Sequence, residues 1–189
     1  MKSQYFRTFI ALPLHVDTEF IRARNELVTS LGVERISWTN PDQYHVTLRF
    51  IGDTGLDDVK KIGNALHAGI HIPERIRLNL TDLSTFGPRK KPRVIWVGFE
   101  ETSFFGSVKK DVDAVLEQCG IPANEQPFRA HLTLGRVRSL GNLQEYYHVL
   151  EEMKHRFFAP VLFENMVFFR SIPGQRGPEY RVLKELRFR

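Results

Sequence analysis

Two short segments of this chain have the same form, and each puts an imidazole near a hydroxyl. Residues 45–48 read His-Val-Thr-Leu, and residues 131–134, which begin 86 positions later, read His-Leu-Thr-Leu. Both lie in runs that alternate as a β-strand does, with successive side chains on opposite faces. The histidine and threonine of each segment therefore share one face, and the two apolar residues share the other. Two such strands could present two imidazoles and two hydroxyls to one cleft.

These side chains suit acid–base chemistry on a phosphate ester. An imidazole titrates near pH ~6.5, so one neutral and one protonated ring on opposite sides of a phosphorus atom could act as base and acid. Threonine hydroxyls can bind the non-bridging oxygens, and a nearby arginine would add a strong donor. Each proton transfer typically contributes about 10²- to 10⁴-fold in rate. Such a site needs no metal, and we expect neither a metal site nor a cofactor.

Composition narrows the class of protein. A chain of 189 residues with 42% hydrophobic residues can form one domain of two closely packed lobes over residues 1–189. The net charge of +5 is compatible with a phosphate-bearing partner. A single cysteine, Cys119, excludes a disulfide framework and zinc sites built on several cysteines. Without a signal peptide or a membrane-length apolar run, we expect a cytoplasmic protein with no membrane or protein partner.

Hydrophobic periodicity and turn residues predict alternating strands and helices. Helices are predicted over residues 17–30, 56–68, 103–119 and 142–155. Strands are predicted over residues 7–14, 44–51, 76–86, 94–99, 130–137, 158–170 and 180–188, with a short extended piece at 36–38 and turns or loops at 52–55, 87–93 and 174–178. The second half repeats the order of the first, and this mixed order favours an α+β fold over a doubly wound parallel sheet.

The paired motifs resemble those of the two-histidine (2H) phosphoesterase superfamily. Within it the chain is most similar to the RNA 2′,3′-cyclic phosphodiesterase family, also called 2′-5′ RNA ligase. The resemblance covers nearly the whole chain and is carried by residues 7–12, 44–52, 92–98 and 128–137. It implies a bilobal, pseudo-symmetric α+β fold in which two antiparallel sheets line a central cleft, with helices outside.

The resemblance also implies an activity. A terminal 2′,3′-cyclic phosphate, on an RNA end or a nucleoside, would be hydrolysed to a 2′-phosphate, and reversible 2′-5′ RNA ligation is a related activity. His45 of the first motif would be the proton donor and His131 of the second the proton acceptor. Thr47 and Thr133 would bind phosphate.

One further position differs between the two copies. Arg136, five residues after the second histidine, matches a basic position of the family near the substrate. Phe50, five after the first, matches an aromatic position that can face the nucleobase. Phe50 lies at odd spacing from Thr47, so on a regular strand it would point away from the catalytic face, and core packing is an equal expectation. Ala130 stands where the family often has proline.

Alternatives remain open. One is a related phosphoesterase acting on a non-RNA substrate, such as ADP-ribose 1″,2″-cyclic phosphate or 2′-5′ oligoadenylate. Another is an RNA-binding protein without turnover, which the intact histidine and threonine pairs disfavour. The basic loop at residues 89–93 could follow an RNA backbone. His67 and His71 have a metal-ligand spacing but no third ligand, and Trp38 and Trp96 are expected to be packing residues.

Overall fold

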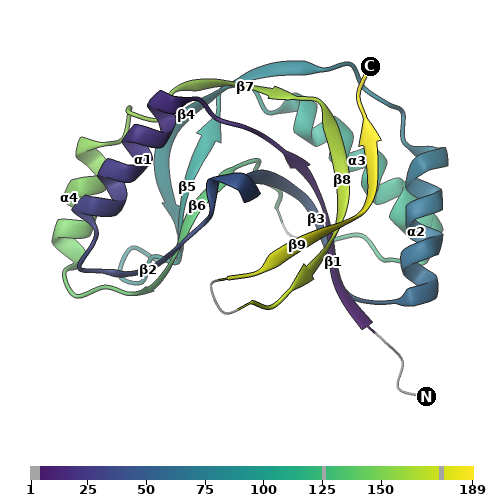
Figure 1. Ribbon diagram of the computed structural model, residues 1–189, viewed down its shortest axis with the longest axis horizontal. Coiled ribbons are helices and arrows are strands. Elements are labelled where there is room, and N and C mark those ends of the chain that lie inside the picture. Colours follow the sequence, from purple (N-terminus) through teal and green to yellow (C-terminus); the bar gives the residue numbers. More distant parts are fainter. Residues whose placement is uncertain (1–4, 125–126, 175–176) are drawn as a thin grey trace.

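Two antiparallel sheets form the centre of the molecule. The computed structural model describes residues 5–124, 127–174 and 177–189 (Figure 1). The first sheet, here the His45 sheet, has the order β3-β1-β8-β9, with bounds His45–Gly55, Tyr5–Pro13, Asn165–Ile172 and Glu179–Arg187. The second, the His131 sheet, has the order β2-β6-β5-β4-β7, with bounds Arg35–Trp38, Leu132–Ser139, Val94–Phe99, Ile76–Phe86 and Ala159–Phe163. A 3₁₀ turn at Pro41–Gln43 leads into β3.

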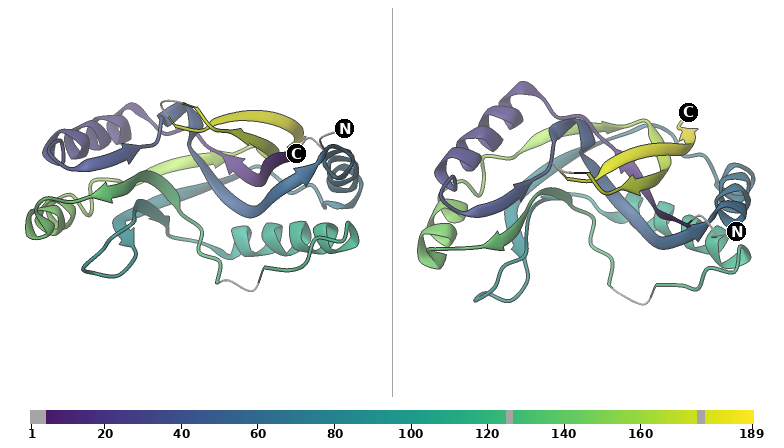
Figure 2. Two further views of the ribbon diagram at one scale, coloured as in Figure 1. Left: turned by 90° about the horizontal axis from the view of Figure 1, so that it is seen from below. Right: turned by 60° about the horizontal axis from the view of Figure 1, so that its bottom comes forward.

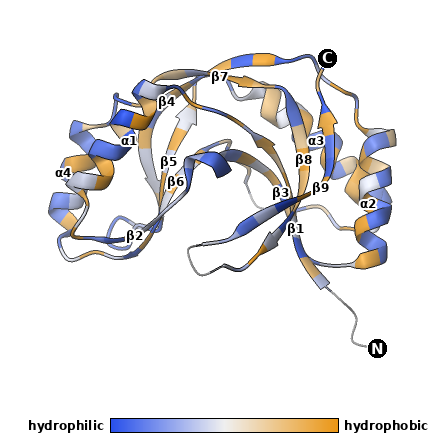
Figure 3. Cartoon of the chain, in the orientation of Figure 1, coloured by the Kyte–Doolittle hydropathy of each residue, from blue (hydrophilic) through white to orange (hydrophobic). Residues whose placement is uncertain are grey.

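The helices lie at the two ends of this pair of sheets. Helices α1 (Thr18–Ser30) and α4 (Leu143–Glu152) lie together at one end, and α2 (Leu56–Gly69) and α3 (Ser103–Gln118) at the other (Figures 1 and 2). Each helix carries hydrophobic and hydrophilic residues in turn, as an amphipathic helix does (Figure 3). Their buried residues join strand residues of both sheets in one hydrophobic cluster. The two sheets with helices outside confirm the predicted α+β class.

Each sheet is assembled from distant parts of the chain. The His45 sheet combines β1 and β3 from the first third of the sequence with β8 and β9 from its end. The repeated order of elements therefore does not divide the chain into two consecutive lobes, because the strands of one sheet enclose those of the other in sequence. Of the helices in the described ranges, none has the length and apolar character that crossing a membrane requires.

Two sequence predictions of strand limits are wrong. The apolar run 158–170 is two strands in different sheets, β7 and β8, separated by Glu164. Burial alternates along β7 but is continuous over residues 166–168 of β8, a difference that overall apolar content hides. Residues 52–55 do not close β3 but belong to it, with Gly52 at a φ of 90°. In the predicted loop 174–178, residues 175–176 lie outside the described residues.

A buried ion pair ties β3 to α3. The Arg49 side chain is 6% exposed, and its Nη1 lies 3.3 Å from Oδ1 of Asp113. Its Nη2 donates to the carbonyl of Pro122, in the segment that leads to the second motif. Asp113 also pairs with Lys109, one turn earlier in α3. Arg49 thus joins the first motif strand, a helix and the approach to the second motif.

Replacing Arg49 should destabilise the fold strongly. Arg49→Ala leaves the largely buried Asp113 carboxylate with Lys109 alone and removes the Arg49 donor from the Pro122 carbonyl, so we expect the free energy of unfolding to fall by about 3 kcal/mol. Urea denaturation measures this loss. The matched control is Arg22→Ala, whose pair with Glu19 is exposed and should contribute less than about 1 kcal/mol. Equal small losses in both variants would contradict a structural role for the buried pair.

Candidate active site

Each motif places its histidine and threonine on one face, as predicted. In β3 the side chains of His45 and Thr47 are partly buried, whereas the alternating Val46 is fully buried. The second motif has the same pattern, with His131 directly before β6 and Thr133 within it. Because the apolar residues of each motif enter the core, the polar pairs face the space between the two sheets.

A bulge in β3 decides where Phe50 points. Thr47 and Arg49 face consecutive residues of β1, so Leu48 has no partner of its own. One extra residue shifts the alternation by one, which brings Phe50 to the face of Thr47. Phe50 pairs with Phe9, their ring centroids are 5.8 Å apart, and Phe50 is 62% exposed. The odd spacing therefore does not send Phe50 into the core.

A matching bulge lies in β6. Thr133 and Gly135 face consecutive residues of β5, so Leu134 is the extra residue. This returns Arg136 to the face of Thr133. A Cβ on Gly135 would lie 2.9 Å from the ring of Trp38 in β2, so only glycine allows this close approach. The leucine of each motif is thus a bulge residue, and the residue five after each histidine reaches the cleft.

Both imidazoles are held by the same hydrogen bond. Nδ1 of His45 lies 2.7 Å from the carbonyl oxygen of Gln43, and Nδ1 of His131 lies 2.7 Å from that of Arg129. A carbonyl can only accept, so Nδ1 carries the proton in each ring and Nε2 is the atom left to exchange a proton with a ligand. The bond fixes both the tautomer and the ring orientation.

Aromatic rings surround each histidine. On the His45 side, the ring of His45 lies 5.3 Å from that of Phe9 and 5.3 Å from that of Tyr180. On the other side, His131 meets Phe86 edge-on at 4.9 Å. Trp96 stacks on Phe86 and lies 6.1 Å from His131, so it packs as predicted and also borders the imidazole.

Comparison with known proteins places the chain in a family. Residues 10–96 match the family described as LigT-like phosphoesterase. The RNA 2′,3′-cyclic phosphodiesterase of Aeropyrum pernix is 31% identical over 147 residues, which cover 77% of this chain and 82% of that protein. The chain belongs to the LigT-like phosphoesterase family. The phosphodiesterase of the same name from Methanocaldococcus jannaschii is 25% identical over 95% of this chain and 99% of that one.

Solved structures share the fold of this phosphoesterase. The protein TT0787 of Thermus thermophilus superposes with a TM-score of 0.72 at 23% identity, covering 96% of this chain and 97% of that one. Escherichia coli LigT, solved in complex with 3′-AMP, gives a TM-score of 0.72 at 18% identity and covers 98% and 99%. These likenesses confirm the two-sheet architecture predicted for a 2H phosphoesterase.

Burial and positive charge act together on the imidazoles of this phosphoesterase. Desolvation is the main cause that lowers the pKa of both His45 and His131, and the hydrogen bond from each Nδ1 to a carbonyl opposes it. The charge of Arg136 lowers the pKa of both histidines further. A charge on His131 also lowers the pKa of His45, so the two rings influence each other.

Sequence reasoning missed two residues at the site. Tyr180, in β9, contacts His45, and burial raises the pKa of its hydroxyl while the charge of Arg136 opposes that rise. No motif marks Tyr180, because it is far from His45 in sequence and only sheet pairing brings it close. Arg129, two residues before His131, holds that ring through its carbonyl. Its position in the segment of the second motif is the sequence signal that could have identified it.

Other predicted features lie outside this arrangement. Helix α2 ends at Gly69, between His67 and His71, so the two histidines do not share a helix face. Among the residues that the structure describes, no three His, Cys, Asp or Glu side chains are grouped as metal ligands. In the basic loop, Arg89 lies over the ring of Tyr147 in α4, and its carbonyl accepts from that tyrosine.

Removing the shared charge should raise both histidine pKa values. Arg136→Gln eliminates a cation that opposes protonation, so the pKa of His45 and that of His131 should both move up towards the ordinary histidine value. A proton NMR titration of the imidazole resonances measures both. Arg138→Gln is the control, because Arg138 is exposed and bonds to Ser37 instead. If the two variants gave the same titration curves, Arg136 would not act on the cleft.

Proposed function

We propose that this phosphoesterase is an RNA 2′,3′-cyclic phosphodiesterase that hydrolyses a terminal 2′,3′-cyclic phosphate to a 2′-phosphate. The observation that carries the proposal is the pair of imidazoles, each anchored through Nδ1 to a carbonyl two residues earlier, with a threonine beside each. The charge of Arg136 acts on both rings, as expected for a donor to a phosphate held between them. The names of the relatives from Aeropyrum pernix and Methanocaldococcus jannaschii support the substrate class.

The proposed reaction is a single in-line displacement. Nε2 of His131 takes a proton from water, and the water oxygen forms a bond to phosphorus. The bond between phosphorus and O3′ breaks as His45 gives its proton to O3′. The products are a 3′-hydroxyl and a 2′-phosphate, and the proton gained by His131 and the one lost by His45 balance over the cycle.

The remaining site residues bind the substrate in this proposal. Thr47 and Thr133 donate hydroxyl protons to the non-bridging oxygens, and the Arg136 guanidinium stabilises their charge. The exposed ring of Phe50 stacks on the terminal nucleobase, and stacking of this kind contributes about 1–3 kcal/mol per base. Together these contacts hold phosphorus between the two imidazoles.

The free cleft does not itself make His45 the acid. Burial and positive charge lower the pKa of both imidazoles, whereas the family resemblance assigns proton donation to His45. A bound phosphate anion favours protonation of both rings and, by position, can favour the ring next to the leaving oxygen. The assignment of roles therefore needs a direct test.

Product analysis tests the reaction. An RNA ending in a 2′,3′-cyclic phosphate should give only a 2′-phosphate, and the rate should be unchanged by EDTA, because two imidazoles and Arg136 supply the proton transfers and the positive charge. Chromatography against 2′- and 3′-phosphate standards identifies the product. A 3′-phosphate would mean that the other ester bond breaks, and loss of activity on chelation would contradict a metal-independent mechanism.

Histidine variants test the roles. His45→Ala and His131→Ala should each lower kcat by at least about 10²-fold on the normal substrate. On an analogue with sulfur in place of O3′, the leaving thiolate needs little protonation, so only the variant that lacks the acid should recover. We expect recovery in His45→Ala.

The matched control is His148→Ala, which removes an exposed histidine of α4 that pairs with Glu152. His148→Ala should leave the rates on the normal substrate and on the sulfur analogue unchanged. Recovery in His131→Ala instead would reverse the two roles, and near-normal rates of either catalytic variant on the normal substrate would contradict the two-histidine mechanism.

A further inference from the structure

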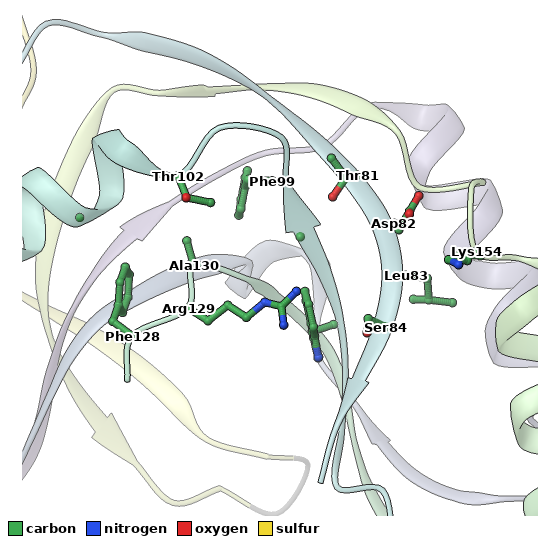
Figure 4. A pocket seen from close by; sticks show the side chains of 13 residues that line it. Thr81, Asp82, Leu83, Ser84, Phe99, Thr102, Phe128, Arg129, Ala130 and Lys154 are labelled. Atoms are coloured by element: carbon green, nitrogen blue, oxygen red, sulfur yellow. The ribbon is translucent and has the colours of Figure 1, made fainter. Parts of the chain in front are cut away.

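A second recess adjoins the active site on the His131 sheet. It is a pocket of about 660 Å³ bordered by β4, β5, the start of α3 and the segment before His131 (Figure 4). None of the six residues predicted for the site lines it. We propose that this pocket binds the nucleotide that precedes the cyclic-phosphate end of an RNA substrate, an inference that rests on the function proposed above.

The pocket begins where the catalytic site ends. Arg129 and Ala130, the two residues before His131, both line it. The Arg129 carbonyl anchors the imidazole, while its guanidinium carbon lies 4.4 Å from the ring centroid of Trp96. Trp96 in turn borders both the pocket and the ring of His131. The pocket and the ring of His131 therefore share Trp96 as a neighbour.

The lining combines the groups that a nucleotide requires. Aromatic rings and hydroxyls suit a base and a sugar, and cations suit a phosphate. The aromatic residues are Trp96, Phe99 and Phe128, the hydroxyl residues are Thr81, Ser84 and Thr102, and the cations are Arg129 and Lys154. The one carboxylate in the lining, Asp82, lies 2.7 Å from the ring of His155. The volume is within the usual range for ligand sites of about 300–1,000 Å³.

One buried donor in the pocket wall lacks an acceptor. Trp96 is only 3% exposed, and its Nε1 has no hydrogen-bond partner among the described residues. A buried donor left unpaired is costly, and native structures usually satisfy such groups. Gly98 keeps this wall open, because a Cβ there would lie 3.0 Å from Oγ1 of Thr81 and 3.3 Å from the Trp96 ring.

Substrate geometry gives the direction of the chain. The ribose of the terminal nucleotide carries the cyclic phosphate on one edge, with the base and the 5′ oxygen on different carbons. If the base stacks on Phe50 of the His45 sheet, the 5′ oxygen is free to point towards the His131 sheet. The Arg129 side chain extends into the pocket on that sheet, with its guanidinium over the ring of Trp96 in β5 (Figure 4). It is placed to bind the phosphodiester that links the last two nucleotides.

The test compares two substrates that share one terminal nucleoside. Adenosine 2′,3′-cyclic phosphate fills only the catalytic site, whereas a dinucleotide ending in the same group also reaches the pocket. We expect kcat/KM to be about tenfold higher for the dinucleotide. Lys154→Glu reverses a charge in the pocket and should remove most of this advantage, with turnover of the mononucleotide unchanged.

Lys60→Glu is the matched control, because Lys60 is exposed on α2 and changes the net charge equally. The Lys60→Glu variant should keep the higher kcat/KM for the dinucleotide. Equal kcat/KM for the two substrates in the wild type would overturn the pocket assignment while leaving the proposed function intact. Loss of the advantage in the control, or its retention in Lys154→Glu, would also overturn the assignment. If neither substrate were turned over, the proposed function would fail and the pocket assignment with it.

Discussion

One extra residue in each motif strand determines how this cleft is built. A regular strand carries only alternate residues to one face, so positions two and five after the start of a motif would lie on opposite faces. The bulge at Leu48, and its counterpart at Leu134, absorbs one residue and places the fifth position beside the histidine and threonine. Three side chains from one short segment then lie on the same face of the sheet. The repetition of this device in both sheets makes the site pseudo-symmetric.

The same bulge also serves the fold. When Phe50 turns towards the cleft, Arg49 turns towards the helices and pairs with Asp113 beneath the sheet. Its second bond, to the carbonyl of Pro122, reaches the segment that leads to the second motif. A local distortion of β3 thus connects the position of one motif to the approach of the other. The bulge in β3 therefore contributes both to the stability of the fold and to the geometry of the site.

Asymmetry enters through the side chains that the two bulges present. One side offers an exposed ring, Phe50, over the buried Phe9, and the other offers the cation Arg136. The cation acts on both imidazoles, so their pKa values are linked to each other and to any anion between them. Two strands of similar geometry can in this way bind the two ends of one substrate through different side chains. The pocket beside Arg129 lies on the His131 sheet, so the difference between the two sides of the cleft extends beyond the reacting group.

The two motifs are visible in the sequence itself. Local periodicity was enough to predict the shared face of each histidine and threonine, the α+β class and most element positions. It did not reveal that the run 158–170 divides between two sheets, because apolar content does not specify a strand's partner. Nor could it show that Phe50 faces the cleft, since a bulge exists only relative to a paired strand. The folded chain brings Tyr180 to His45, and Trp96 with Arg129 to the pocket, because sheet pairing joins residues that no spacing in the chain connects.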